Sequence, residues 1–136
     1  MRNILLPIIG SIMLWGCQTL PMIGGAETLT APEVRRLFVG NTVESYNMNT
    51  GLNSFTYYHP NGQAIQERLW AQRMGSWKIE QDGKICLAFD KSEPNCRHII
   101  RERGRYYKVL ADDAGEQQKI VRYRYFANGN ALAGDA

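Results

Sequence analysis

The chain has 136 residues, of which 44% are hydrophobic and 21% are charged, and its formal net charge is +3. This length fits one domain with one hydrophobic core, so an assembly of several domains is not expected. The positive charge is too small to indicate a protein that binds nucleic acid, and we expect no nucleic-acid partner.

The N-terminus has the pattern of an export signal. It starts with a single charged residue, Arg2, followed by an apolar run over residues 4–15. A helix that crosses a bilayer needs about 20 residues, so a run of roughly a dozen is too short for a lasting span. A basic start, a short apolar stretch and a small residue before the cleavage point are typical of a signal peptide, here predicted over residues 1–16.

Residues 14–17, Leu-Trp-Gly-Cys, resemble the lipobox of bacterial lipoproteins, although Trp15 replaces the small or β-branched residue usual in that family. The resemblance implies that Cys17 becomes the lipidated N-terminus, and the attached acyl chains would then anchor the protein to the membrane. Gln18 in place of Asp implies the outer membrane of a Gram-negative bacterium, with the protein facing the periplasm. The alternative is an ordinary signal peptide or an uncleaved anchor, with Cys17 unmodified.

Residues 17–28 are predicted to form this lipidated N-terminus and a tether. Residues 18–26 carry no charge and include Pro21, Gly24 and Gly25, so they are too short and too irregular to contribute a core. The folded β-domain is therefore expected over residues 29–126.

One short helix is predicted at the start of this domain. Thr30 and Glu33 form a capping-box pattern, in which each side chain satisfies a free backbone amide at the helix start. Val34, Leu37 and Phe38 fall on one face of the helix, and Gly40 is placed to end it.

Beyond this helix, short segments rich in β-branched and aromatic residues alternate with turn motifs such as His-Pro-Asn-Gly at 59–62 and Asp-Gly at 82–83. Short strands with frequent turns favour an antiparallel barrel or sandwich. The sequence thus predicts a mainly β fold of seven to eight antiparallel strands, with a flexible tail over residues 127–136. The strands are expected over residues 42–46, 54–58, 63–70, 76–80, 84–89, 96–101, 105–110 and 118–126.

Cys86 and Cys96 remain as an even pair once Cys17 is assigned to lipid. In an exported domain such a pair is expected to form a disulfide, which would stabilise the fold by about 2–3 kcal/mol. A redox pair or a metal site is the alternative, but redox pairs usually have the Cys-x-x-Cys spacing, and these two cysteines are farther apart.

No catalytic constellation is visible in the sequence. The two histidines, His59 and His98, have no Gly-x-Ser-x-Gly partner, and their spacing from the cysteines matches no zinc or haem pattern. We therefore expect a protein without catalytic activity, without a cofactor and without a metal.

Basic and aromatic residues interleave in the C-terminal third of the chain. Arg101, Arg105, Arg122 and Arg124 are the candidate binding residues, because guanidinium groups hold phosphates and carboxylates by paired hydrogen bonds. On a strand, Arg122 and Arg124 would face solvent while Tyr123 and Tyr125 would face the core. Such a surface could bind an anionic envelope ligand or an envelope protein, and the alternative is an ordinary solvated face.

The segments 75–79 (Gly-Ser-Trp-Lys-Ile), 82–87 (Asp-Gly-Lys-Ile-Cys-Leu) and 104–107 (Gly-Arg-Tyr-Tyr), together with Cys96, resemble a pattern in small exported proteobacterial lipoproteins with an uncharacterised β-domain. A weaker similarity, through the Gly-x-Trp strand and the following cysteine, is to the eight-stranded barrel inhibitors of bacterial metalloproteases. In those inhibitors the mature N-terminus enters the protease cleft, whereas lipidation at Cys17 would occupy that end here.

Together these patterns predict a lipid-anchored binding or assembly component of the cell envelope. A periplasmic protease inhibitor of the β-barrel type is the alternative.

Overall fold

The computed structural model describes residues 25–133. The predicted signal peptide, Cys17 and most of the predicted tether lie outside the described residues. Within the described part of the chain, no helix is both long enough and apolar enough to cross a membrane.

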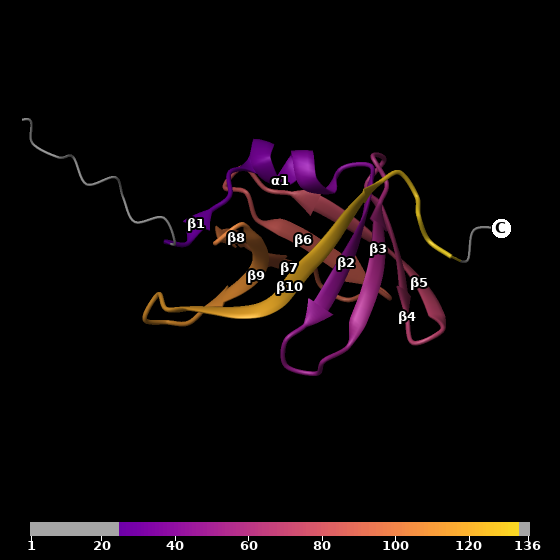
Figure 1. The fold of residues 1–136 in the computed structure, drawn as a ribbon. Helices are drawn as coiled ribbons and strands as arrows, with labels where there is room; N and C mark the ends of the chain where they lie inside the picture. The colour runs from indigo at the N-terminus through magenta and orange to yellow at the C-terminus, as the bar shows by residue number, and fades with distance from the viewer. Residues whose placement is uncertain (1–24, 134–136) are drawn as a thin grey trace, which may run out of the picture.

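The described chain is mainly β with one short helix, as predicted (Figure 1). Its elements follow one another as β1 (Glu27–Thr28), α1 (Ala31–Phe38), β2 (Asn41–Asn47), β3 (Asn53–Tyr58), β4 (Gln63–Arg68), β5 (Ala71–Ile79), β6 (Ile85–Phe89), β7 (Asn95–Arg97), β8 (Ile99–Glu102), β9 (Arg105–Ala111) and β10 (Gln117–Asn128).

The strands form one antiparallel sheet in the order β1-β8-β9-β10-β2-β3-β4-β5-β6-β7, curled into a half-barrel. The described chain has ten strands, so the prediction of seven to eight is wrong. The expected strand 96–101 is split at His98 into β7 and β8, and the two-residue β1 precedes the helix.

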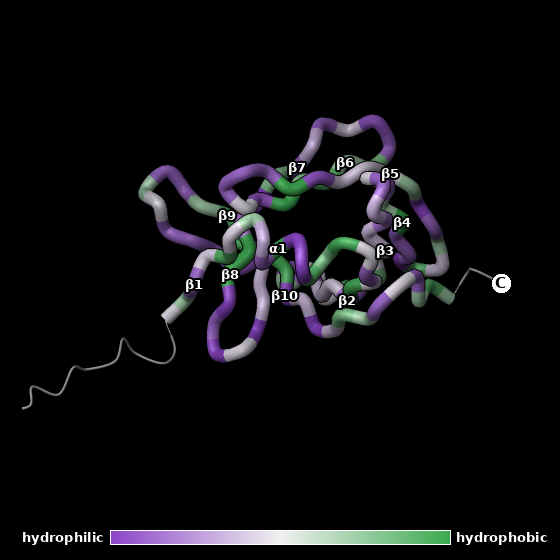
Figure 2. Tube along the Cα trace, turned by 90° about the horizontal axis from the view of Figure 1, so that it is seen from above, coloured by the Kyte–Doolittle hydropathy of each residue, from purple (hydrophilic) through white to green (hydrophobic). Residues whose placement is uncertain are grey.

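His98 connects two strands, β7 and β8, that lie near opposite margins of the sheet. β7 pairs with β6 at one margin and β8 pairs with β9 near the other, although a single residue separates β7 from β8. Figure 2, seen from above the helix, shows the strands following one another around the molecule.

Local sequence signals, Thr30 and Glu33 at the start and Gly40 at the end, set the bounds of helix α1. The Glu33 carboxylate accepts hydrogen bonds from the Thr30 amide (3.2 Å) and the Thr30 hydroxyl (2.9 Å), and these bonds hold the pKa of Glu33 below its usual value. Gly40 has a φ of +72°, a conformation that favours glycine, and its amide donates to the Tyr58 carbonyl (2.8 Å). This turn leads the chain directly into β2.

The hydrophobic core lies between α1 and the inner face of the sheet. The Phe38 ring makes edge-to-face contacts with Tyr58, Tyr123 and Phe126, with ring centroids 5.0, 5.1 and 5.7 Å away. Burying a large apolar side chain contributes about 1.5–3 kcal/mol, so this end of the molecule holds much of the stability. Leu29, Val34, Val43, Ile85 and Ile99 complete the buried cluster.

Strand β5 begins at Ala71, five residues before the expected start at residue 76. The expected strand 63–70 included Leu69 and Trp70, which instead form the two-residue turn between β4 and β5. Arg68 pairs with Ala71 across this turn, and both turn residues have positive φ values.

The described part of the expected tail is held against β2. Strand β10 continues to Asn128, and Leu132 is buried. The Thr42 hydroxyl donates to the Gly129 carbonyl (2.7 Å) and accepts from the Ala131 amide (2.8 Å). These contacts lie in the first part of the segment 127–136, whose flexibility stays a prediction.

Candidate functional site

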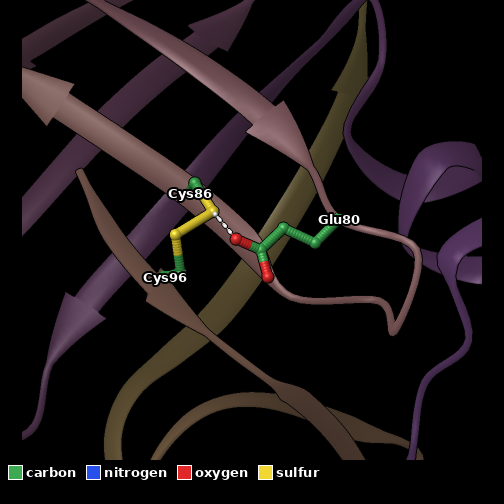
Figure 3. A group of neighbouring side chains, drawn as sticks. All are labelled: Glu80, Cys86 and Cys96. Carbon is green, nitrogen blue, oxygen red and sulfur yellow. Dashed lines mark hydrogen bonds between the residues drawn. A yellow bond between two sulfur atoms is a disulfide. The ribbon is translucent and has the colours of Figure 1, made fainter.

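The predicted disulfide between Cys86 and Cys96 is confirmed, and it joins β6 to β7 at directly opposite positions (Figure 3). Glu80 lies beside it, with a carboxylate oxygen 3.4 Å from the Cys86 sulfur. These three residues are types that can ligate metals, but the bonded sulfurs offer no thiolate. The bridge therefore acts as a staple in this state.

The four arginines predicted to bind a ligand do not form one site. Arg101 pairs with Glu27 at 2.6 Å. Across the sheet, Ile100 lies opposite Tyr107, and Tyr107 lies opposite Arg122, so Arg101 and Arg122 project from opposite faces.

Arg124 is already engaged by neighbouring side chains. Its guanidinium stacks on the Tyr46 ring at 4.0 Å from the centroid, donates to the Asn53 carboxamide oxygen (3.0 Å) and lies 4.0 Å from the Glu44 carboxylate. Arg105 is exposed at the start of β9, beside Glu102.

The prediction that Tyr123 and Tyr125 both face the core is correct for Tyr123 alone. Tyr123 is 4% exposed, whereas Tyr125 is 61% exposed. A β-bulge between the two residues shifts the register against β2, so Tyr125 lies opposite Glu44 on the outer face. The outer arginines therefore have an exposed tyrosine beside them.

A different polar site lies on the inner face of the half-barrel, toward the end away from α1. It is a cavity of about 190 Å³, and its cationic residues are Arg68, Arg73 and Lys108. No carboxylate, histidine or cysteine belongs to its lining. The other lining residues are Ser45, Asn47, Thr50, Leu52, Ser54, Thr56, Tyr58, Gln66, Leu87 and Val121. We call it the basic cavity.

The strand register gathers this lining. Thr56 pairs with Gln66, and Gln66 pairs with Arg73, so the three side chains lie in a row across β3, β4 and β5 on one face. The buried Gln66 amide donates to the Thr56 hydroxyl (3.1 Å) and its oxygen accepts from Arg73 Nε (2.7 Å). The Arg73 guanidinium also stacks over Phe89 at 4.1 Å, so its position is fixed.

Lys108 enters the cavity from β9, where it lies opposite Ile99 on one side and Val121 on the other. Its side chain is half-buried, and it has no ion pair among the described residues. Burial first, and the nearby Arg97 second, lower the pKa of Lys108 to about 8. Burial and Arg68 likewise lower the pKa of Arg73, against an opposing effect of Asp90.

An anion in the basic cavity would relieve these unfavourable interactions. Arg73 and Lys108 are partly removed from water and form no ion pair among the described residues, while Arg68 is exposed beside them. A bound phosphate or carboxylate would supply the missing negative charge. The arrangement is therefore suited to holding a small anionic group.

The basic cavity was not among the sites predicted from the sequence. A signal was present, because the inward positions of β3 and β4 change from apolar residues near the helix, Tyr58 and Ala64, to polar ones at the far end, Ser54 and Arg68. A strand whose inner face turns polar at one end indicates a binding cavity rather than continuous core.

Comparison with known proteins identifies no relative of this chain. No family model matches the chain, and no curated protein matches it significantly. The family resemblances drawn from the sequence stay predictions.

Proposed function

We propose that this protein is a non-enzymatic binding component of the cell envelope that holds an anionic ligand in the basic cavity. The observation that carries the proposal is a cavity with three cationic side chains and no carboxylate in its lining. In this proposal Cys17 carries the lipid anchor, and the domain faces the periplasm from the outer membrane.

The residue types fit recognition of a phosphate or carboxylate group. Arginine presents a planar fork of N–H donors, and Arg73 is held in place at Gln66 and Phe89. Lysine adds a compact point charge from the opposite wall of the cavity. The small volume suits one anionic group rather than a large cofactor.

Binding is favoured over catalysis by what surrounds the cavity. Its lining contains hydroxyls and amides but no histidine, cysteine or carboxylate that could pair as acid and base. Lys108 is placed for charge recognition, because with a pKa of about 8 most of it is protonated at neutral pH.

Titration of the full chain with inorganic phosphate tests this proposal, with amide shifts in NMR spectra as the readout. Lys108→Met keeps the apolar stem and removes the charge, and it should weaken phosphate binding at least tenfold. Lys78→Met is the matched control, because Lys78 is exposed on the outer face of β5 and should behave as the unaltered protein. Equal phosphate affinity in both variants would overturn the assignment of the cavity.

The lipid anchor has a separate test. Replacing Cys17 with serine should release the protein from sedimented membranes into the soluble periplasmic fraction. Continued sedimentation of Cys17→Ser with the outer membrane, after alkaline washing, would contradict anchoring through this cysteine.

The protease-inhibitor alternative remains a prediction. The segment that would enter a protease is the mature N-terminus, which lies outside the described residues, and no described contact favours this function. Stoichiometric inhibition of an endogenous metalloprotease by the full chain would support the inhibitor, and it would replace the binding proposal if Lys108→Met bound phosphate normally.

A further inference from the structure

The turn between β4 and β5 exposes two large apolar side chains at its tip. Leu69 and Trp70 are 61% and 104% exposed, and their φ values are +49° and +63°. Two-residue turns of this kind favour Asn-Gly, because a side chain makes the left-handed conformation unfavourable. Bulky apolar residues here are opposed both by their backbone conformation and by their exposure, so folding does not explain them.

A second hairpin adds to this apolar surface. The β2–β3 connection exposes Met48 (42%) and Leu52 (37%), and both hairpins point away from α1 (Figure 1). We call Met48, Leu52, Leu69 and Trp70 the apolar rim.

The apolar rim adjoins the basic cavity. Leu52 lines the cavity itself, and Arg68 immediately precedes the exposed turn. Arg68 also lines a groove of about 610 Å³ that includes Phe55, Leu69 and Trp70, and the carboxylate of Glu67 lines the same groove. The cationic lining of the basic cavity and the exposed apolar side chains of the β4–β5 turn therefore adjoin each other at this end of the molecule.

We infer that this end docks on an anionic lipid bilayer, with Leu69 and Trp70 entering the interface and a lipid phosphate entering the basic cavity. The inference rests on the proposed function of the cavity and names its ligand as the headgroup of an anionic lipid. Tryptophan is favoured at the level of lipid headgroups, and nearby cations are attracted to an anionic surface.

The shape of the tip favours a bilayer over other partners. A soluble anion would use the cations but leave the apolar rim in water. Trp70 is fully exposed on a protruding two-residue turn, so an occupant must surround it from several sides. A fluid bilayer does this without a preformed pocket, and its anionic headgroups complement Arg68, Arg73 and Lys108.

Quenching of tryptophan emission by vesicles with brominated acyl chains gives a direct test. The full chain is mixed with brominated phosphatidylglycerol or brominated phosphatidylcholine vesicles, and the same measurement on Trp70→Phe is subtracted to leave the emission of Trp70. Phosphatidylglycerol should quench that emission by at least half and shift it to shorter wavelength, whereas phosphatidylcholine should not. Emission typical of water-exposed indole in both vesicles would overturn the inference.

A double variant separates docking from folding. Leu69→Asn with Trp70→Gly introduces the turn sequence that this backbone favours, so the protein should remain folded. Residues 1–16 and the lipid can bind vesicles by themselves. Both proteins therefore carry Cys17→Ser, which removes the lipid. The quantity compared is the gain in affinity from phosphatidylcholine to phosphatidylglycerol, because residues 1–16 are the same in both proteins. The gain should fall at least tenfold in the turn variant. Met74→Ser, an exposed change on the outer face of β5, should leave it within twofold.

The outcomes distinguish this inference from the proposed function. Phosphate binding that depends on Lys108, with a turn variant that still prefers anionic vesicles, would overturn bilayer docking and leave anion binding standing. If the unaltered chain does not bind phosphate, the proposed function is overturned. Protection of Trp70 by a soluble envelope protein but not by vesicles would assign the apolar rim to a protein partner and overturn docking on lipid.

Discussion

The two ends of the half-barrel are built from the same strands but have opposite chemistry. Near α1, β3 contributes the buried Tyr58, which packs edge-to-face against Phe38. At the far end the same face of β3 carries Ser54, and the facing strands contribute Arg73 and Lys108. The helix covers one end of the half-barrel with apolar contacts, whereas the cationic side chains at the other end line a cavity.

This difference separates stability from binding. Apolar burial at the helix end stabilises the fold, while the partly desolvated Arg73 and Lys108 of the basic cavity oppose it. We therefore expect substitutions near α1 to change mainly the free energy of unfolding, and substitutions in the basic cavity to change mainly anion affinity.

The largest effect should follow removal of the ring at the centre of the helix end. Phe38 is fully buried, and Phe38→Ala should lower the free energy of unfolding by about 3–5 kcal/mol because it leaves a cavity among three aromatic rings. Urea denaturation measures the change. Phe55→Ala, on the exposed outer face, is the control and should lower stability by less than about 1 kcal/mol. Similar losses in the two variants would remove the contrast between the ends.

The disulfide should matter to stability and not to binding. Replacing Cys86 and Cys96 together by serine should lower the free energy of unfolding by about 2–3 kcal/mol, because the unfolded chain loses the closed loop and regains conformational entropy. Phosphate affinity should stay within twofold, since neither cysteine lines the basic cavity. A loss of affinity as large as that of Lys108→Met would show that the staple shapes the site.

Lys108 should make stability and binding depend on pH in opposite directions. Its pKa is lowered from 10.5 to about 8, so between these values the unfolded chain binds more protons than the folded protein. The free energy of unfolding should therefore rise from pH 8 to pH 9.5, by about 1 kcal/mol after allowance for partial solvent exposure. Phosphate affinity should fall over the same range as Lys108 loses its charge.

Two buried tyrosines limit that pH window. Burial raises the pKa of Tyr58 and Tyr123, so above pH 10 the unfolded chain loses protons that the folded protein keeps, and stability falls. Urea titrations of Lys108→Met between pH 7 and 9.5 should show a flatter profile than the unaltered protein. An unchanged profile would assign the rise to another group.

Local sequence signals predicted the elements that depend on neighbouring residues. The capping pair Thr30 and Glu33, the turn at Gly40 and the cysteine pair are all formed as expected. The turn at Leu69 and Trp70 was missed because both residues are common in strands, and the pairing of Arg68 with Ala71 decides the turn. The unfavourable backbone conformation of Leu69 and Trp70 follows from the pairing of β4 with β5 and not from the two residues themselves.

The basic cavity was not predicted from the sequence, because it depends on pairing between strands distant in sequence. Gln66 lies opposite Arg73, and Lys108 lies opposite Val121, and no local pattern states either register. The bulge that turns Tyr125 outward is equally a property of the pairing between β10 and β2. Residue type drew attention to Arg101, Arg105, Arg122 and Arg124, none of which lines the basic cavity, whereas strand register gathers Arg68, Arg73 and Lys108 there.

The smallest effect is expected from the outer arginine that the sequence had favoured. Arg124 is exposed, and its contacts with Tyr46, Glu44 and Asn53 lie on the outer face. Arg124→Gln should lower the free energy of unfolding by less than about 1 kcal/mol, because exposed ion pairs contribute little, and phosphate affinity should be unchanged. Isothermal titration with phosphate, beside Arg73→Gln, measures the contrast. A tenfold loss in Arg124→Gln with none in Arg73→Gln would move the working surface from the basic cavity to the outer face of β10.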